Sequence, residues 1–174
     1  MAPVSRVLAR PVVLLLVFLA PCHEARPAGA GERLFVIERS LNANAVAYDV
    51  VTTGTGRLDP GSPLRVYWIM WAERGQVAEL SVLERSLAYG YDVRSCASGA
   101  CTIALRALRY RPIVVEAEGG PPRAVTSIGG ARAVLRRVFV TVKHGGPFSG
   151  VEAVELFGES CADATPIHER IAGR

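Results

Sequence analysis

Residues 64–71 read LRVYWIMW, and this stretch indicates the fold class more clearly than any other. Its β-branched, aromatic and long apolar residues are the types that favour an extended, pleated strand. Successive side chains of a strand point to opposite faces, so Trp68 and Tyr67 are expected on opposite sides of a sheet. The stretch therefore predicts a β-strand, and the rest of the chain can be compared with it.

Short apolar segments of the same kind lie on both sides of residues 64–71, and clusters of Gly, Pro, Asp and Asn separate them. The segments expected to form the other strands are 34–39, 45–53, 91–96, 101–108, 112–118, 123–128, 135–143 and 151–157. A spacing of about ten residues per strand, with no repeat and no linker, is typical of an antiparallel β-barrel or β-sandwich. Both architectures produce the same alternation. We therefore expect a single mainly-β domain over residues 31–174.

One helix interrupts the strands. Apolar residues recur at helical spacing over residues 77–88, and Ser81 with Glu84 forms a capping-box pattern. Gly90 follows as a residue suited to a left-handed helix cap. The polar tail predicts one further helical turn at 167–172.

Residues 1–30 have the pattern of a signal peptide. Arg6 and Arg10 precede an apolar core at residues 12–20, which is too short to span a bilayer. Small residues before Gly31 favour cleavage there. Two alternatives stay open: an uncleaved anchor, and a lipoprotein in which Cys22 is lipidated, although Pro21 departs from the usual lipobox. All three predict an exported protein, either periplasmic or extracellular, and membrane-anchored only through this segment.

Cys96 and Cys101 flank a Ser-Gly turn signal, so their thiols can face each other across a hairpin. In an oxidising compartment this spacing favours a structural disulfide over free thiols or over a redox or metal pair. Cys161 is then left over, and we expect it to be a buried free thiol.

The charge pattern and the short motifs exclude several function classes. The formal net charge is +4, but the Arg residues are scattered without interleaved aromatics, so we expect no nucleic-acid partner. His144 and His168 have no third ligand nearby, and no phosphate loop or serine elbow occurs. We therefore assign no metal, no cofactor and no catalytic residue.

Four segments come in a characteristic order: LFVIERSLNANAVAYDV at 34–50, PLRVYWIMW at 63–71, LERSLAYGY at 83–91, and VELFGES with HERI within 154–171. Together they resemble the bacterial family catalogued as domain of unknown function 4833. The resemblance implies a secreted or envelope-associated single domain without an established activity. It supplies no catalytic residues, and its pattern is richest in polar residues around positions that include Glu84, Gly158 and Glu169.

The most notable polar cluster begins with Glu38 and Arg39, which point to opposite faces of a strand, so at least one of them needs a partner. Glu84 is a candidate partner for Arg39, and Asn42 and Asn44 are typical turn residues. A structural polar cluster is one interpretation and a ligand site is the other; the aromatic side chains likewise suit a core or a cavity lining. The ligand-binding candidates are Glu38, Arg39, Asn42, Asn44, Tyr67, Trp68, Glu84 and Tyr89.

Three functions remain open. The first is a non-enzymatic binding module for a small apolar or amphiphilic ligand, stacked on the aromatic rings and oriented by Glu38 or Arg39. The second is a structural or protein-interaction domain of the cell envelope, whose strand edges pair with an envelope protein. The third, with least support, is a hydrolase that uses Glu38 with Glu84 or Glu169 as acid and base.

Overall fold

A computed structural model describes residues 31–143 and 150–173, and it confirms a mainly-β protein with one short helix. The strands are β1 (Arg33–Arg39), β2 (Asn42–Val50), β3 (Leu64–Met70), β4 (Gln76–Glu79), β5 (Tyr91–Ala97), β6 (Ala100–Leu105), β7 (Pro112–Glu116), β8 (Arg123–Ile128), β9 (Ala131–Val142), β10 (Val151–Ser160) and β11 (Pro166–Ala172). The helix α1 (Val82–Glu84) continues as a wider turn, η2 (Arg85–Tyr89). Short helical turns η1 (Trp71–Glu73) and η3 (Arg106–Leu108) follow β3 and β6. The predicted signal peptide, with Cys22, lies outside the described residues.

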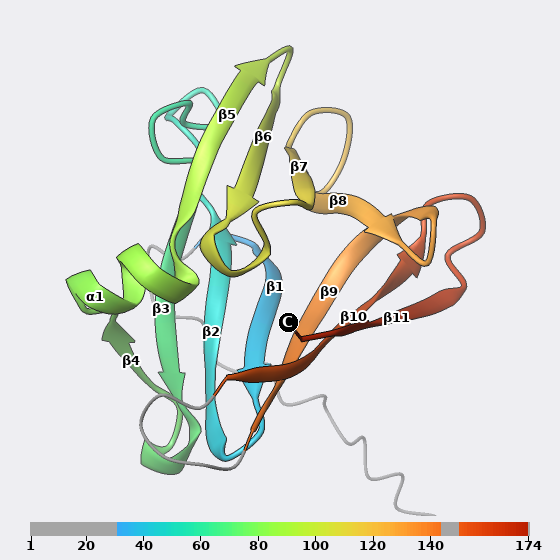
Figure 1. The fold of residues 1–174 in the computed structure, drawn as a ribbon. Coiled ribbons are helices and arrows are strands. Elements are labelled where there is room, and N and C mark those ends of the chain that lie inside the picture. Colours follow the sequence, from blue (N-terminus) through green and yellow to red (C-terminus); the bar gives the residue numbers. More distant parts are fainter. Residues whose placement is uncertain (1–30, 144–149, 174) are drawn as a thin grey trace, which may run out of the picture.

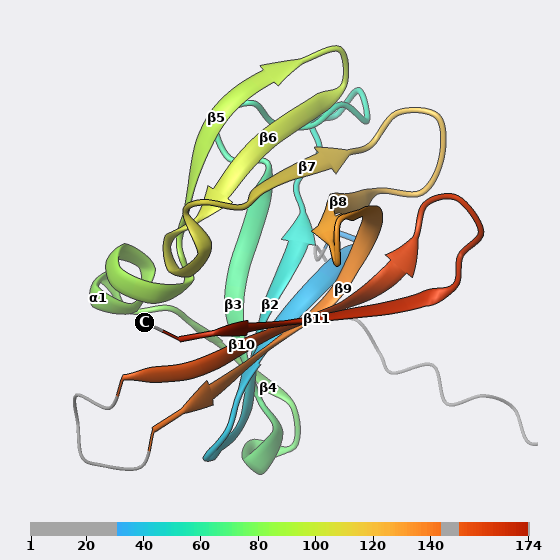
Figure 2. The ribbon, with the colours of Figure 1, turned by 45° about the vertical axis from the view of Figure 1, so that its right-hand side comes forward.

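All eleven strands belong to one sheet, which curls into a half-barrel (Figures 1 and 2). The strand order is β4-β3-β2-β1-β9-β8-β7-β6-β5, and β10 and β11 extend from the other side of β9. Every neighbouring pair is antiparallel except β1 with β9, which is parallel and makes the sheet mixed. The expected antiparallel pairing is therefore confirmed for strands that follow one another in sequence. The one parallel pair joins strands that are distant in sequence.

Strand β9 changes partners along its length. Residues 131–134 pair with β8, residues 137–140 pair with β1, and β10 runs along the opposite edge of β9. Between the two segments Arg136 is an extra residue, because Phe157 pairs with Arg137 while Gly158 pairs with Leu135. This β-bulge lets the sheet bend at the point where three strands meet β9.

The main apolar core fills the concave face of the half-barrel, and a smaller group of side chains covers the outer face of β1–β3. Within this core, Tyr48 and Phe35 stack at 4.4 Å between ring centroids. The largest fully buried side chains are Tyr48, Tyr67, Phe35, Ile103, Leu105, Ile113, Ile128, Leu135 and Leu156. Strand β3 thus has apolar contacts on both faces, because Val66 and Trp68 lie in the main core and Tyr67 and Ile69 lie in the smaller group.

The helix begins later than its apolar periodicity predicted. Residues 76–79 form β4, Ser81 caps α1 with the predicted capping box, and the helical segment ends at Tyr89. Leu80 is buried, but Leu83 and Leu87 are each 68% exposed, so the periodic residues do not form a core-facing stripe. Tertiary pairing with β3 overrides the helical pattern at the start of the segment.

Three smaller expectations were also wrong. Residues 166–172 form a strand, because Ile167, Glu169 and Ile171 alternate with exposed residues and pair with β10. Gly90 is extended (φ −69°) rather than left-handed, and glycine is needed because a Cβ would lie 2.0 Å from the Arg85 carbonyl oxygen. The free thiol of Cys161 is exposed.

Candidate functional site

Four of the predicted candidates meet on the concave side of the sheet, and we call them the aromatic mouth: Arg39, Trp68, Glu84 and Tyr89. The Arg39 guanidinium carbon lies 6.0 Å from the Trp68 ring centroid and 5.9 Å from that of Tyr89. The two rings meet edge to face at 5.1 Å. Strand β3 supplies Trp68 and the η2 turn supplies Tyr89, so the mouth joins segments distant in sequence.

Glu84 connects the helix to this mouth. Its carboxylate accepts a hydrogen bond from the Trp68 indole N–H at 3.2 Å and others from the backbone and hydroxyl of Ser81. Burial acts to raise the pKa of the Glu84 carboxyl, but these hydrogen bonds and the nearby Arg39 charge lower it below its ordinary value. Among the described residues, Glu84 and Arg39 form no direct ion pair, and the guanidinium acts on the carboxylate through its charge.

Arg39 is half-buried, and its guanidinium donates no hydrogen bond to any residue in the described part of the chain. Its contacts there are the two aromatic rings and the long-range attraction of Glu84. A guanidinium has five N–H donors in a planar fork that matches a carboxylate or phosphate. Within residues 31–143 and 150–173, these donors of Arg39 meet no acceptor.

A row of half-buried apolar side chains leads away from Arg39 across the sheet. In register, Arg39 of β1 is opposite Val140 of β9, Val140 is opposite Val154 of β10, and Val154 is opposite Ile171 of β11. All three apolar residues pack on the rim of the main core without being covered by it. We call them the apolar row. Three strand spacings correspond to about 14 Å.

Asn42 and Asn44 lie at the start of β2, where the pairing with β1 shifts register. The Asn42 side chain accepts a hydrogen bond from the Asn44 backbone N–H at 2.9 Å, as expected of a turn residue. The Asn44 Oδ1 atom is buried and has no hydrogen-bond partner among the residues that the structure describes. The turn role predicted for Asn42 is therefore present, and Asn44 leaves one acceptor unused.

Glu38 and Tyr67 lie on the other face of the sheet. Glu38 forms an ion pair with Arg137 at 3.4 Å. The Tyr67 hydroxyl donates to Asp49 at 2.5 Å and accepts from Arg33 at 2.9 Å. Neither residue can contact a ligand held by the aromatic mouth.

The buried network of Asp49, Arg33 and Tyr67 was not predicted from the sequence. Asp49 is fully buried, and Arg33 Nε binds its Oδ1 at 3.2 Å. Burial raises the pKa of the Tyr67 hydroxyl, and its hydrogen bond to Asp49 raises it further. The sequence signal that could have indicated this network is Asp49, an acidic residue within the apolar run of β2. In the structure this position pairs with Arg33.

Glu169 on β11 binds two partners that are distant from it in sequence. It forms a bidentate ion pair with Arg111 at 2.7 Å and accepts the Gly129 backbone N–H at 2.8 Å. Glu38, Glu84 and Glu169 thus bind three different sets of partners, and the structure brings no two of them together.

The Glu169 contacts predict an acid-dependent stability. Hydrogen bonds from Arg111 are the main cause that lowers the pKa of the Glu169 carboxyl in the folded protein. Such a carboxylate stabilises the fold above its unfolded pKa and loses that effect as the pH falls through the folded value. We expect Glu169→Gln to lower the free energy of unfolding by about 2 kcal/mol at neutral pH and to flatten its decrease below about pH 5.

Urea unfolding at several pH values measures this effect. Glu159→Gln is the control, because Glu159 is a more exposed carboxylate paired with Arg136. Parallel stability–pH curves for the wild type and Glu169→Gln would contradict the assignment.

The disulfide between Cys96 and Cys101 is present, as predicted. Among residues 31–143 and 150–173, no group of three or more His, Cys, Asp or Glu side chains is arranged to hold a metal ion. Within the same residues, no helix is both long enough and apolar enough to cross a membrane.

Comparison with known proteins gives one match. The family model described as Domain of unknown function (DUF4833) matches residues 35–170, which is most of the chain. No curated protein and no solved structure matches the chain.

Proposed function

The chain belongs to the DUF4833 family of domains of unknown function, and from its geometry we propose that it is a non-enzymatic binding module for an amphiphile with an anionic head and an apolar tail. The aromatic mouth would bind the head group. The apolar row would contact the tail. The sequence led us to expect a small ligand that is either apolar or amphiphilic, and the aromatic mouth favours an amphiphile with an anionic head.

The guanidinium of Arg39, which has no hydrogen-bond acceptor among the described residues, is the observation that carries this proposal. A half-buried cation without hydrogen-bond acceptors loses hydration that aromatic contacts replace only in part. A carboxylate or phosphate would supply those acceptors in a charge-assisted, bidentate geometry. The buried Asn44 oxygen near the same end of β2 is an acceptor that a protonated or hydroxylated head group could also use.

The apolar row explains why the ligand would be an amphiphile rather than a small anion. Val140, Val154 and Ile171 follow Arg39 directly in register, so an aliphatic chain anchored at the guanidinium would lie along them. Each methylene that leaves water for such a surface contributes up to about 0.8 kcal/mol.

An exported location fits this function. The Cys96–Cys101 disulfide is consistent with an oxidising compartment outside the cytoplasm. The signal peptide predicted over residues 1–30 would direct the domain to that compartment, where it could meet amphiphiles of the cell envelope.

Fluorescence of Trp68 can test the head-group contact. The chain has two Trp residues, so Trp71→Phe leaves Trp68 as the sole indole reporter. We expect decanoate to change Trp68 emission, and Arg39→Met to weaken decanoate binding by about tenfold or more, because a charge-assisted hydrogen bond contributes about 1.5–3 kcal/mol.

Two controls separate the Arg39 contact from general effects. Arg65→Met removes a similar guanidinium that lies 5.0 Å from the Tyr67 ring centroid on the other face, and it should leave decanoate affinity unchanged. Decanol lacks the carboxylate, so Arg39→Met should not weaken its binding. Equal decanoate affinity in wild type and Arg39→Met, or an equal loss in Arg65→Met, would overturn the proposal.

A further inference from the structure

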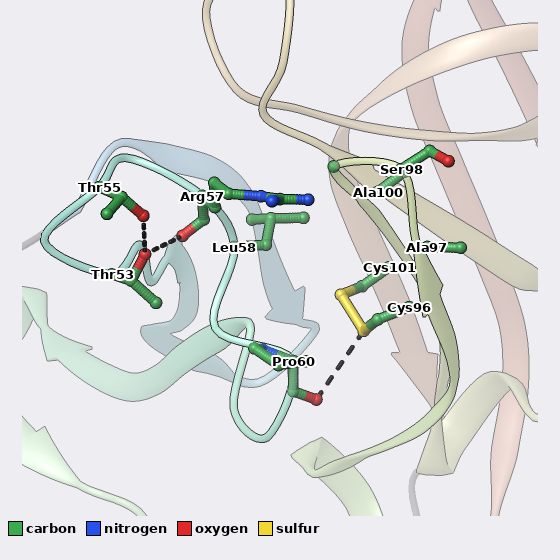
Figure 3. A pocket seen from close by; sticks show the side chains of 11 residues that line it. Thr53, Thr55, Arg57, Leu58, Pro60, Cys96, Ala97, Ser98, Ala100 and Cys101 are labelled. Carbon is green, nitrogen blue, oxygen red and sulfur yellow. Dashed lines mark hydrogen bonds between the residues drawn. A yellow bond between two sulfur atoms is a disulfide. The ribbon is translucent and has the colours of Figure 1, made fainter.

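A pocket of about 410 Å³ lies at the opposite end of β2 from Asn42 and the aromatic mouth (Figure 3). One wall is the connection between β2 and β3, and the other is the β5–β6 hairpin. The residues that line it are Thr53, Thr55, Arg57, Leu58, Pro60, Cys96, Ala97, Ser98, Gly99, Ala100 and Cys101. Its volume is within the range of small-molecule sites, about 300–1,000 Å³.

The first wall is a preformed loop. The Thr53 backbone N–H donates to the Arg57 carbonyl at 2.7 Å, and the Gly56 N–H donates to the Thr53 carbonyl at 2.8 Å. Thr52 and Leu58 form an isolated β-bridge beside this turn. These hydrogen bonds fix the loop backbone, so a ligand would not have to order it on binding.

The disulfide fixes the second wall. Cys96 and Cys101 are opposite each other in register, and Ser98 and Gly99 both have positive φ (47° and 72°) in the tight turn between them. The Cys96 Sγ atom lies 3.8 Å from the Pro60 carbonyl oxygen of the first wall. The disulfide therefore stands where the two walls meet, as Figure 3 shows.

Arg57 is the only charged residue among those that line the pocket. Figure 3 shows its side chain extending across the pocket toward the hairpin. Its one ion pair in the described chain, with Glu118, is long at 3.7 Å, and both side chains are more than half exposed. Such a pair contributes little, so an incoming anion can replace Glu118 at low cost.

Apart from Arg57 and the Ser98 hydroxyl, the side chains of the lining are apolar or use their hydroxyl hydrogens within the loop. The Thr53 hydroxyl donates to the Arg57 carbonyl oxygen, so the contact of 2.9 Å between the Thr53 and Thr55 hydroxyls takes its hydrogen from Thr55. Leu58, at 7% exposed, presents apolar surface beside the Cys96–Cys101 disulfide. Sulfur atoms also make favourable contacts with aromatic rings.

We propose that this pocket binds a small aromatic carboxylate, with the carboxylate on Arg57 and the ring against Leu58 and the disulfide. The site is separate from the aromatic mouth, and neither proposal depends on the other. An aromatic ring fits the short, preformed walls better than a flexible chain, because it loses less conformational freedom on binding.

Titration of the ¹⁵N-labelled protein with 3-phenylpropionate tests this site. We expect the amide signals of Thr53, Gly56, Ser98 and Gly99 to shift together, and Arg57→Gln to weaken binding at least tenfold. The neutral alcohol 3-phenylpropanol should bind at least tenfold more weakly than the carboxylate. Arg94→Gln is the matched control, because Arg94 is an exposed arginine on β5 outside the lining.

The disulfide offers a second test. Replacing Cys96 and Cys101 together by Ser should reduce 3-phenylpropionate affinity, while the remaining amide spectrum reports whether the fold persists. If that variant unfolds, the Arg57→Gln result decides. Shifts that are absent, that fall elsewhere, or that Arg57→Gln leaves unchanged would overturn the proposal, whatever decanoate does at the aromatic mouth.

Discussion

Arg33→Met is expected to lower the free energy of unfolding by about 3 kcal/mol, because it leaves the Asp49 carboxylate buried without its cation. Asp49 is fully buried, and its oxygens bind only Arg33 and Tyr67 among the side chains of the described residues. The Arg33 side chain is 30% exposed, which places the expected loss at the lower end of the range for broken buried pairs.

Urea unfolding of the single and double variants measures this effect. Asp49→Asn removes the unpaired charge and keeps an oxygen that the Tyr67 hydroxyl can bind, so Arg33→Met with Asp49→Asn should lose less stability than Arg33→Met alone. Arg136→Met is the control for a surface pair, since Arg136 and Glu159 are 51% and 43% exposed, and it should cost less than about 1 kcal/mol. A loss for Arg33→Met no larger than that of Arg136→Met would mean that Asp49 is not held by this pair.

The strands that could be predicted from the sequence are those whose local pattern agrees with their final surroundings. Residues 64–71 alternate, and both faces of β3 find apolar neighbours. Strand β4 could not be found, because Val77 and Leu80 fit a helical period and only the pairing with β3 makes the segment extended. Strand β11 was missed because charged Glu169 stands between Ile167 and Ile171 on the less exposed face, and its partner Arg111 lies far away in sequence.

In the candidate site, too, some features could be predicted from the sequence and others depend on contacts between distant segments. Residue types and faces named Arg39, Trp68, Glu84 and Tyr89, which lie together, but Glu84 forms no direct ion pair with Arg39 in the described chain and feels only its charge. The sequence could not show that the indole of Trp68, rather than the guanidinium, would take the Glu84 carboxylate. The apolar row was beyond prediction, because it depends on the parallel register of β1 with β9.

Gly158→Ala is expected to destabilise the protein by about 3 kcal/mol, since overpacking against backbone is at the upper end of such effects. A Cβ at this position would lie 2.4 Å from the Val134 carbonyl oxygen and 2.7 Å from the Ile128 Cδ1 atom. The backbone of β9 cannot move away freely there, because the Arg136 bulge and the change of partner from β8 to β1 occur at this point.

Thermal or urea unfolding of Gly158→Ala should be compared with Gly120→Ala. A Cβ at Gly120 would meet nothing within 4 Å, and its φ is not in the left-handed range, so that variant should change stability by less than about 1 kcal/mol. A Gly158→Ala protein as stable as Gly120→Ala would mean that β10 can shift relative to β9. The register that aligns Val154 with Val140 would then be free to slip, and the apolar row would lose the alignment with Arg39 on which amphiphile binding depends.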